Sequence, residues 1–554
     1  MLRLGLLLDS VTPSRWAAVA LERTLATKQA SVALVVLNHS GVAPSAEGTR
    51  LVRWWRNRAY LPLAAYERFD RWKFGLDRNW FEPTDISALI GGAEIIRVAP
   101  RQTTFSDYFE DADTDRILAY ELDIAVRFGF RILRGRALSI AKYGVWSYHH
   151  GDNRVNRGGP AGLWEVLEAH PTTGSVLQVL SESLDGGRVL SRSWSRTVPY
   201  SAGRNREQFY AQSLPMLAAQ VSAVALGLDN VEGETPGEVA AYSRPLYTAP
   251  RGGQMLRMAM GVAGRYVANQ VRGRLTQLQW FLCYRRTPRQ GYDSGTPDLA
   301  PFRFTRLVPP VDRFWADPFP VRVADADFIV FEEFVTAEGK GHISVAEIDA
   351  NGIVGSITRV LEQPYHLSYP FMLAAGGEHY MVPETATARR VEMWRATRFP
   401  FEWEKCADLL TDRERVDSTI VRHNGLWWLF AASSEGGSES WDELEIYYAS
   451  SPLGPWTPHP RNPVKSDVRS ARPAGQFFTQ NGRLYRPSQD GSLSYGGALA
   501  IQEVQALTTT EFRERCVTRV DPLWMPNLVG VHTVNAIDGL TVIDARRRIG
   551  RWSK

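Results

Sequence analysis

The segment ADPFPVRVADADFIVFEEF, residues 316–334, contains two short apolar stretches joined by the turn VADAD. This pattern predicts an antiparallel hairpin of two strands. A strand, a Gly/Asp/Asn turn and a second strand recur four more times, in SYPFMLAAGGEHYMVPETA (368–386), DSTIVRHNGLWWLFAASS (417–434), ARPAGQFFTQNGRLYRPSQD (471–490) and GVHTVNAIDGLTVIDARR (530–547). The sequence therefore repeats with a period of about 50 residues.

Each repeat continues into further strand-like sequence, such as HISVAEI (342–348) and VEMWRAT (391–397). Four short strands in each unit are typical of a propeller blade. The five units therefore predict an all-β five-bladed β-propeller over residues 301–554. The segment QWFLCYR (279–285) is expected to join the last blade, which would leave no open sheet edge.

The first 225 residues have a different pattern. Apolar strand-like runs, including LGLLL (4–8), SVALVVLN (31–38), AEIIRVAP (93–100) and LDIAVRFG (122–129), alternate with helix-like segments such as RWAAVALERTLA. This alternation predicts an α/β, Rossmann-like domain with a largely parallel sheet. The chain is thus expected to be multidomain, with a linker over residues 226–300 between the α/β domain and the propeller.

The linker contains a helical pattern at 254–275 with four arginines and no acidic residue. A basic amphipathic helix can lie on an anionic membrane surface, and it can also serve as a bracket between domains. Both interpretations stay open from the sequence. Peripheral membrane contact through 254–275 is therefore one expectation for this protein.

The composition narrows the choice of compartment and partner. The 554 residues carry a formal net charge of only +4, so no nucleic-acid partner is expected. The three cysteines are far apart and form no disulfide framework, which fits a reducing compartment. We found no signal peptide and no apolar run of transmembrane length. We therefore expect a cytoplasmic protein, located at the inner face of the membrane if the basic helix binds lipid.

Two adjacent histidines stand in SYHHGDN (147–153), after a predicted strand. His149 would lie at the carboxyl end of that strand, where open α/β sheets place their ligands. Asp185 follows the strand-like run SVLQVLSESLD, and a carboxylate facing His149 would favour proton exchange near neutral pH. A metal site of His149, His150 and Asp152 is the competing interpretation. Adjacent residues on a strand point to opposite faces, so we predict no metal there.

The same region resembles the methionyl-tRNA formyltransferase family, which includes the sugar N-formyltransferases. The resemblance covers about 1–225 and is carried by Gly144, Ser147-Tyr148-His149, Arg157-Gly158, Thr173-Gly174 and Leu184-Asp185-Gly186-Gly187. It implies a fold that binds N10-formyltetrahydrofolate and passes the formyl group to an amine. By this resemblance His149 would move the proton of the attacking amine, and Asp185 would orient His149.

One position departs from the family pattern, because Ser147 stands where the family has asparagine. That asparagine would hold the formyl oxygen, and loss of an oxyanion donor typically costs about 10²–10³ in rate. Ser147 is expected to compensate in part. The residues expected to support the substrate or the oxyanion are His150, Asp152, Asn153 and Arg157.

The predicted propeller offers a second site. Asp317 and Asp417 fall at corresponding places in their repeats, and Glu384 lies on a second strand. Three carboxylates suit glycoside chemistry, with two working acids and one orienting acid. The polar residues Tyr369, Arg472, Gln489 and His532 could contact sugar hydroxyls or hydrogen-bond between blades. Trp427 and Trp428 are interpreted as packing residues.

Residues 300–520 contain ADPFPV, HLSYPFM, PET, ARPAG and YRPSQD. These motifs resemble the N-terminal domain of plant glucosamine inositolphosphorylceramide transferases, and the fold resembles five-bladed glycoside hydrolases. Both resemblances imply a carbohydrate ligand. Our main hypothesis is an N-formyltransferase acting on an amino sugar, either a nucleotide sugar or a glycan. The alternatives are a glycoside hydrolase or glycosyl-transfer enzyme that uses the propeller carboxylates, and a non-catalytic carbohydrate-binding scaffold.

Overall fold

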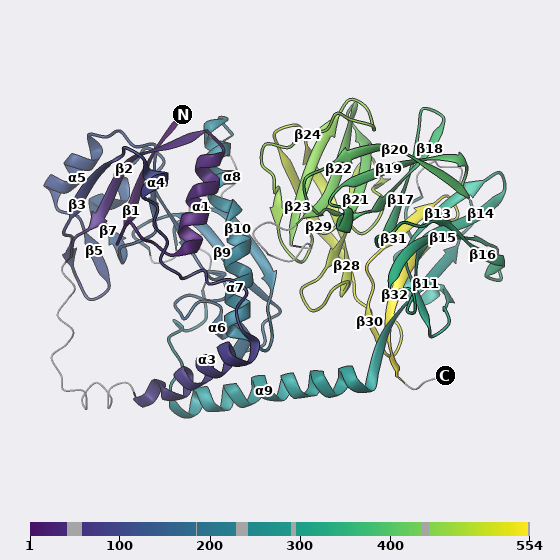
Figure 1. Ribbon diagram of the computed structural model, residues 1–554, viewed down its shortest axis with the longest axis horizontal. Coiled ribbons are helices and arrows are strands. Elements are labelled where there is room, and N and C mark those ends of the chain that lie inside the picture. The colour runs from purple at the N-terminus through teal and green to yellow at the C-terminus, as the bar shows by residue number, and fades with distance from the viewer. Residues whose placement is uncertain (41–57, 184–185, 229–241, 290–294, 434–441, 552–554) are drawn as a thin grey trace. The chain divides into compact units, whose positions relative to one another are not determined.

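The computed structural model describes residues 1–40, 58–183, 186–228, 242–289, 295–433 and 442–551 (Figure 1). The chain divides into two compact units. Unit 1 spans Met1–Val267, and unit 2 begins at Ala268. The boundary falls inside the long helix α9 (Gly252–Leu275).

Unit 1 is built on a seven-stranded sheet with the order β10-β9-β8-β6-β1-β2-β3. The strands are β1 (Leu2–Leu8), β2 (Ala30–Asn38), β3 (Glu94–Val98), β6 (Ile124–Arg127), β8 (Val145–His149), β9 (Thr172–Val179) and β10 (Arg188–Arg196). The pairs from β3 to β8 are parallel, whereas β9 and β10 are antiparallel. The described part of unit 1 therefore has the α/β layout predicted from alternating strands and helices.

Helices and a small second sheet complete the described part of unit 1. The helices are α1 (Arg15–Ala26), α3 (Leu61–Phe74), α4 (Ser87–Ile90), α5 (Asp111–Leu118), α6 (Leu163–Leu167), α7 (Ala202–Ser213), α8 (Pro215–Ala225) and α9. The small sheet contains β4 (Arg101–Gln102), β5 (Ser106–Tyr108) and β7 (Ile132–Arg134). Both faces of the main sheet are covered, because Leu6 and Leu8 of β1 enter one core cluster and Leu7 enters another.

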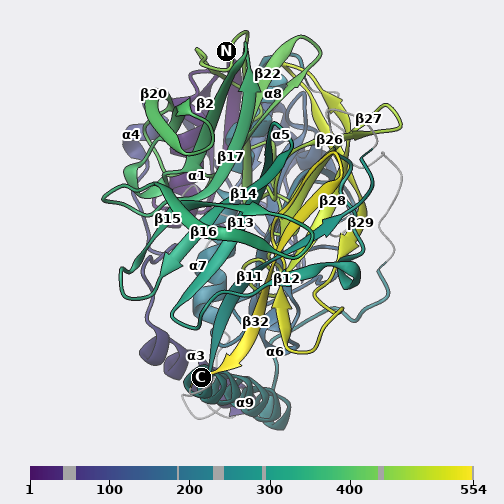
Figure 2. The same ribbon diagram turned by 90° about the vertical axis from the view of Figure 1, so that its right-hand side faces the viewer.

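The described residues of unit 2 form five largely antiparallel sheets (Figure 2). Four of them follow one another along the chain. These are β13 (Arg313–Val323), β14 (Ala326–Val335), β15 (Lys340–Ile348) and β16 (Ile353–Leu361); β17 (Ser368–Ala375), β18 (Glu378–Glu384), β19 (Val391–Arg398) and β20 (Glu402–Leu410); β21 (Val416–His423), β22 (Leu426–Ser433), β23 (Glu443–Ala449), β24 (Thr457–Pro458) and β25 (Lys465–Ser466); and β26 (Phe478–Gln480), β27 (Arg483–Asp490), β28 (Ala498–Leu507) and β29 (Phe512–Val520).

The fifth sheet combines the two ends of unit 2. It contains β11 (Thr276–Arg286), β12 (Thr305–Leu307), β30 (Leu528–Gly530), β31 (Val534–Ile537) and β32 (Leu540–Gly550). Strand β11 pairs with β32 along its whole length, from Thr276 opposite Gly550 to Arg286 opposite Leu540. The predicted joining of segment 279–285 to the last repeat is therefore present.

The first strands of three consecutive sheets share one irregularity. In β13, β17 and β21 the pairing register shifts immediately around Asp317, Tyr369 and Asp417, respectively. These three residues have φ angles of 50°, 43° and 53°. A left-handed conformation is unfavourable for residues other than glycine and is often found at functional sites. The repeat thus places three polar side chains in equivalent strained positions.

Candidate functional site

Each repeat of unit 2 contributes one polar residue from its first segment, and we call these five residues the inner positions. They are Asp317, Tyr369, Asp417, Arg472 and His532. All five were predicted as candidate site residues, Asp317 and Asp417 from their matching places in the repeats and the other three as polar contacts, and all five are buried. They lie in one network of contacts with Glu384 and Gln489, which come from the second strands β18 and β27. The side chains of Glu384 and Arg472 retain 12% and 10% exposure, so they are the members of this network that solvent reaches.

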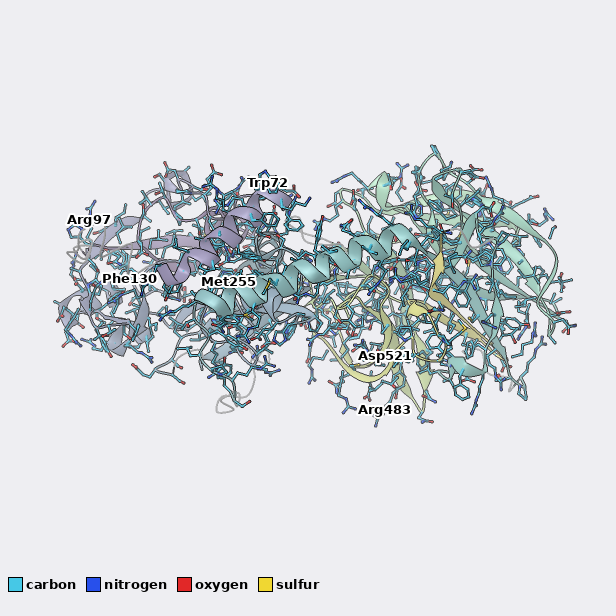
Figure 3. The ribbon with its side chains drawn as sticks, turned by 90° about the horizontal axis from the view of Figure 1, so that it is seen from below. Trp72, Arg97, Phe130, Met255, Arg483 and Asp521 are labelled. Carbon is cyan, nitrogen blue, oxygen red and sulfur yellow. The ribbon has the colours of Figure 1, made fainter. Side chains whose placement is uncertain are left out.

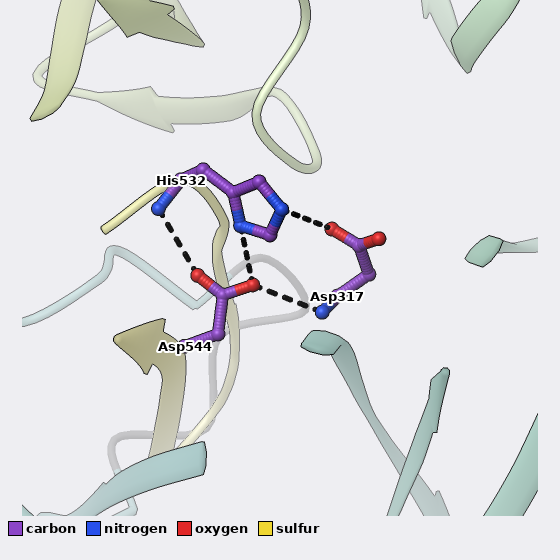
Figure 4. A group of neighbouring side chains, drawn as sticks. All are labelled: Asp317, His532 and Asp544. Atoms are coloured by element: carbon purple, nitrogen blue, oxygen red, sulfur yellow. Dashed lines mark hydrogen bonds and ion pairs between the residues drawn. The ribbon is translucent and has the colours of Figure 1, made fainter. Parts of the chain in front are cut away.

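His532 is held between two carboxylates (Figure 4). Its Nδ1 lies 2.5 Å from Asp544 Oδ2, and its Nε2 lies 3.6 Å from Asp317 Oδ1. Trp280 stacks on the imidazole with ring centroids 4.0 Å apart. Burial alone would lower the pKa of His532, but the Asp544 and Asp317 carboxylates raise it above its ordinary value. The imidazole is therefore suited to carry a proton.

The donor atoms of Asp317, His532 and Asp544 lie within 4.8 Å of one another, which is close enough to hold a metal ion. However, Asp544 Oδ1 already accepts the backbone N–H groups of His532 and Thr533, each at 3.0 Å. Asp544 Oδ2 accepts the backbone N–H of Asp317 at 2.9 Å, in addition to the imidazole. With its oxygens occupied in this way, Asp544 fits the role of a group that orients His532 better than that of a metal ligand.

Asp317 is a buried carboxylate with several electrostatic neighbours. Its Oδ1 accepts a hydrogen bond of 2.7 Å from the Thr533 hydroxyl. Burial raises the pKa of Asp317 to about 6, although nearby His532 acts in the opposite direction and Asp544 adds to the rise. A carboxyl with this pKa can change its protonation state close to neutral pH.

A second carboxylate group surrounds Arg472. The guanidinium donates to Asp417, and Gln489 Nε2 donates to Asp417 Oδ2 at 2.8 Å. Arg472 Nη2 also lies 3.6 Å from Glu384 Oε2. Burial, followed by the negative charge of Asp417, raises the pKa of Glu384 well above its ordinary value. The pair of Glu384 and Asp417 thus combines a carboxyl whose pKa is raised with a carboxylate fixed by two donors.

Two buried acceptor atoms of this group have no hydrogen-bond partner among the described residues. They are Glu384 Oε2 and Gln489 Oε1. A buried acceptor without a donor is costly, and such atoms in native proteins call for an explanation, which can be a missing ligand. Both atoms therefore suit a bound molecule that carries hydroxyl or amine donors.

The sequence-based site omitted several residues of this network. Glu332 lies opposite Ala316 in its sheet, as Glu384 lies opposite Ser368. It is buried, and its pKa is raised well above the ordinary value by burial and then by Asp317. The alignment of VFE in the first repeat with VPE in the second could have revealed Glu332. Asp544 occupies the matching VID of the last repeat.

Tyr369 has a structural role among the inner positions. Its hydroxyl hydrogen-bonds Thr419 Oγ1 at 2.8 Å and accepts the backbone N–H of Gly475 at 2.7 Å. These partners belong to the segments that carry Asp417 and Arg472. Tyr369 therefore joins three inner segments, which favours the interpretation of hydrogen bonding between blades over direct sugar contact.

The predicted site of unit 1 is only partly within the described residues. Ser147 is buried, and its hydroxyl accepts a hydrogen bond of 3.0 Å from Arg127 Nε. His149 Nε2 lies 3.2 Å from the backbone oxygen of Asn156. Asp185 lies outside the described residues. The proposed pairing of His149 with Asp185 therefore stays a prediction.

His150 is enclosed by aromatic rings. It stacks on Tyr210 with ring centroids 3.8 Å apart, and the Trp16 ring lies edge-on at 4.8 Å. Neither ring nitrogen has a hydrogen-bond partner among the described residues. Burial, with a smaller effect of His149, lowers the pKa of His150 to about 3. The imidazole is therefore neutral at physiological pH.

The three other predicted residues form a local polar group. Trp194 Nε1 donates to Asp152 Oδ2 at 2.9 Å, and Arg192 Nη1 donates to Asn153 Oδ1 at the same distance. Arg157 Nε donates to the backbone oxygen of Asn153 at 2.9 Å. These contacts fix the loop that follows β8.

Unit 2 thus belongs to the class of all-β proteins, and its inner positions form a buried cluster of carboxylate, guanidinium and imidazole groups. Comparison with known proteins shows which proteins this part of the chain is similar to. Residues 307–521 match the family model described as "Glucosamine inositolphosphorylceramide transferase 1, N-terminal". The proteins of that name from Oryza sativa subsp. japonica and Arabidopsis thaliana are 39% and 37% identical to this chain over 205 residues. The match covers 36% of this chain and 27% of each relative, so it spans about a quarter of their length.

Other similarities are shorter or more distant. A methionyl-tRNA formyltransferase from Bacillus licheniformis is 36% identical over 84 residues, which are 15% of this chain and 27% of that protein. Among solved structures, glycinamide ribonucleotide transformylase 1 from Symbiobacterium toebii has 15% identity and a TM-score of 0.28, covering 41% of this chain and 89% of its own. A family 117 glycoside hydrolase from Zobellia galactanivorans has 15% identity and a TM-score of 0.30, covering 49% and 90%. Similarities at these TM-scores carry no argument about function.

The expectation that this protein is a formyltransferase is wrong. The long matches at 37–39% identity are to proteins named glucosamine inositolphosphorylceramide transferases, and that name describes a reaction different from one-carbon transfer. The expectation rested on the short formyl-transfer pattern of unit 1, in which Ser147 replaces the family asparagine. Binding of N10-formyltetrahydrofolate and a cytoplasmic location stay untested predictions.

Proposed function

We propose that unit 2 closes into a five-bladed propeller that binds a carbohydrate at its inner positions and catalyses glycosyl transfer there. Contacts between successive sheets support closure. The rings of Phe319 and Tyr369 pack edge-on with centroids 5.1 Å apart. Tyr369 forms a hydrogen bond with Thr419, and Arg472 donates a hydrogen bond to Asp417. The ring continues where the backbone N–H of Val534 donates to Ala474 and the Thr533 hydroxyl donates to Asp317.

The observation that carries the proposed activity is the grouping of Glu384, through Arg472, with Asp417 in one network that also contains Asp317. Glu384 is the general acid, because its raised pKa favours its protonated form and its Oε2 has no hydrogen-bond partner among the described residues, with Arg472 Nη2 3.6 Å away. Asp417 lies beside it and maintains that protonation. Gln489 Oε1 is an acceptor available for a sugar hydroxyl.

Asp317 is the general base in this proposal. It is ionised above its pKa of about 6 and can take the proton of an acceptor hydroxyl. The acceptor oxygen then forms a bond to the anomeric carbon as the bond to the leaving oxygen breaks. Glu384 gives its proton to that leaving oxygen, so charge and protons balance. The raised pKa of His532 lets the imidazolium balance the negative charge of Asp317 before the transfer, while Asp317 is ionised.

The test is turnover of a panel of 4-nitrophenyl glycosides by the full chain, with methanol as an added acceptor. Release of 4-nitrophenol together with a methyl glycoside is expected, and the rate should rise through about pH 6 as Asp317 ionises. Glu384→Gln should lower kcat by at least ~100-fold on alkyl glycosides, whose leaving oxygen must be protonated, and by much less on 4-nitrophenyl glycosides. Glu378→Gln is the matched control, because Glu378 is an exposed residue of the same strand. Equal activity of the two variants on alkyl glycosides, or no turnover and no sugar binding by the folded protein, would refute the proposal.

A further inference from the structure

Helix α9 exposes an apolar stripe. Its buried residues are Met255 and Val262, which belong to a core cluster of unit 1. At 100° per residue, four exposed apolar residues fall within a narrow arc on the other side of the helix. They are Leu256 (57% exposed), Met260 (61%), Val267 (57%) and Val271 (49%). A helix that is apolar on two sides has one face without a partner.

The neighbouring helix α3 repeats this arrangement. Its residues Leu63 and Tyr66 pack in the same cluster as Met255. On the opposite side of α3, Phe69 and Trp72 are 54% and 76% exposed, and their ring centroids lie 5.7 Å apart. In Figure 3 the two helices lie next to one another on the face turned toward the viewer, with Trp72 marked on α3 and Met255 on α9. We name these outward sides of α3 and α9 the helical surface.

The exposed charged side chains of helices α3 and α9 are all basic. Helix α9 contains no Asp or Glu, and its Arg257, Arg272 and Arg274 are exposed. Helix α3 adds three exposed basic residues, Arg68, Arg71 and Lys73. Of the two acids of α3, Asp70 is buried and accepts the backbone N–H of Gly203, whereas Glu67 is half-buried. Exposed Trp, Phe, Leu and Met side chains are therefore bordered by cations.

We propose that the helical surface docks this protein on an anionic lipid bilayer. Aromatic and aliphatic side chains of such helices enter the interface between headgroups and acyl chains, and each nearby Arg or Lys adds attraction to anionic lipid. Among the described residues no helix is both long and apolar enough to cross a membrane. The helices therefore lie along the bilayer surface. A protein partner for this basic surface would need a matching acidic groove, whereas a bilayer supplies dispersed negative charge and an apolar layer together.

The experiment is co-sedimentation of the full chain with vesicles of phosphatidylcholine alone and with vesicles that also contain phosphatidylserine. Binding should be at least ~10-fold stronger to the anionic vesicles and should weaken at high salt. Met260→Glu and Trp72→Glu should each abolish most of the binding. Leu523→Glu is the matched control, since Leu523 is 85% exposed and belongs to unit 2.

Several results would overturn the inference. Absence of binding to both kinds of vesicle by folded protein would do so, and so would equal binding by Leu523→Glu and Met260→Glu. Self-association that is lost in Met260→Glu, measured by analytical ultracentrifugation without lipid, would identify a second copy of the chain as the occupant. A soluble protein that competes with vesicles and is released by the same substitutions would point to a protein partner. Glycoside turnover depends on unit 2 and should be unchanged in these variants.

Discussion

Asp317→Asn is expected to stabilise the protein at neutral pH while removing activity. Burial raises the pKa of Asp317 from 3.8 to about 6, so the native state binds this proton more tightly than the unfolded chain. Stability from this group is fully present below pH 4 and is lost as the pH rises through about 6. An upward change of roughly two pH units corresponds to about 3 kcal/mol.

Asparagine at position 317 would remove the negative charge and keep most of the hydrogen bonds around this residue. Asparagine Oδ1 can still accept the 2.7 Å hydrogen bond from the Thr533 hydroxyl, and the backbone N–H of residue 317 still donates to Asp544. His532 keeps its contact of 2.5 Å with Asp544. The substitution removes only the weaker charge–charge attraction between His532 Nε2 and residue 317, whose atoms lie 3.6 Å apart. The variant should therefore gain most of the free energy that ionisation of Asp317 costs.

The assay is urea unfolding of wild type and Asp317→Asn between acidic and neutral pH, followed by tryptophan fluorescence. The variant should be more stable by up to about 3 kcal/mol near pH 7, and the difference should shrink toward zero near pH 4. A variant that is less stable than wild type at neutral pH would refute this reasoning. That result would mean that attraction between Asp317 and His532 outweighs the burial of the carboxylate.

Two further substitutions test the structure of unit 2. Arg472→Met should lower the free energy of unfolding by about 3–5 kcal/mol in chemical denaturation, because it leaves buried Asp417 without its cation; an unchanged midpoint would contradict this. Trp428→Ala should cost about 3–5 kcal/mol, because Trp428 is 1% exposed and its indole donates to His423 O. The neighbouring Trp427→Ala should cost less, since Trp427 is only half-buried. Equal losses for the two tryptophans would contradict the packing of β22.

The sheets of unit 2 were predictable because every repeat contains the same local sequence pattern, a strand, a turn and a second strand. The inner positions follow from it as well, since ADP, SYP, VDS, ARP and VHT occupy matching places in the five repeats. Glu332 was missed although its register equals that of Glu384. Asp544 could be placed beside Asp317 only once β32 was known to return to the start of the unit, and no local pattern encodes that contact.

Function was harder to infer from unit 1. A handful of matching positions, Gly144 and His149 among them, supported a reaction that the longer similarity of unit 2 contradicts. Function depends on the chemistry of individual side chains and less on the fold. The hydroxyl of Ser147 is engaged by Arg127, a contact that strand pairing creates and that spacing along the chain does not reveal.

The pairing of β11 with β32 has a consequence for biosynthesis. Each of the eleven residues of β11 pairs with a residue of β32 that lies 254 to 274 positions later in the chain (540 − 286 and 550 − 276), so the four other sheets of unit 2 are synthesised before the fifth sheet can be completed. During that interval β11 presents an unpaired edge that is prone to association with other nascent chains. A circular permutant that connects residue 550 directly to residue 276 and opens the chain between two other sheets would make this pairing local. It should fold faster and form fewer aggregates during translation.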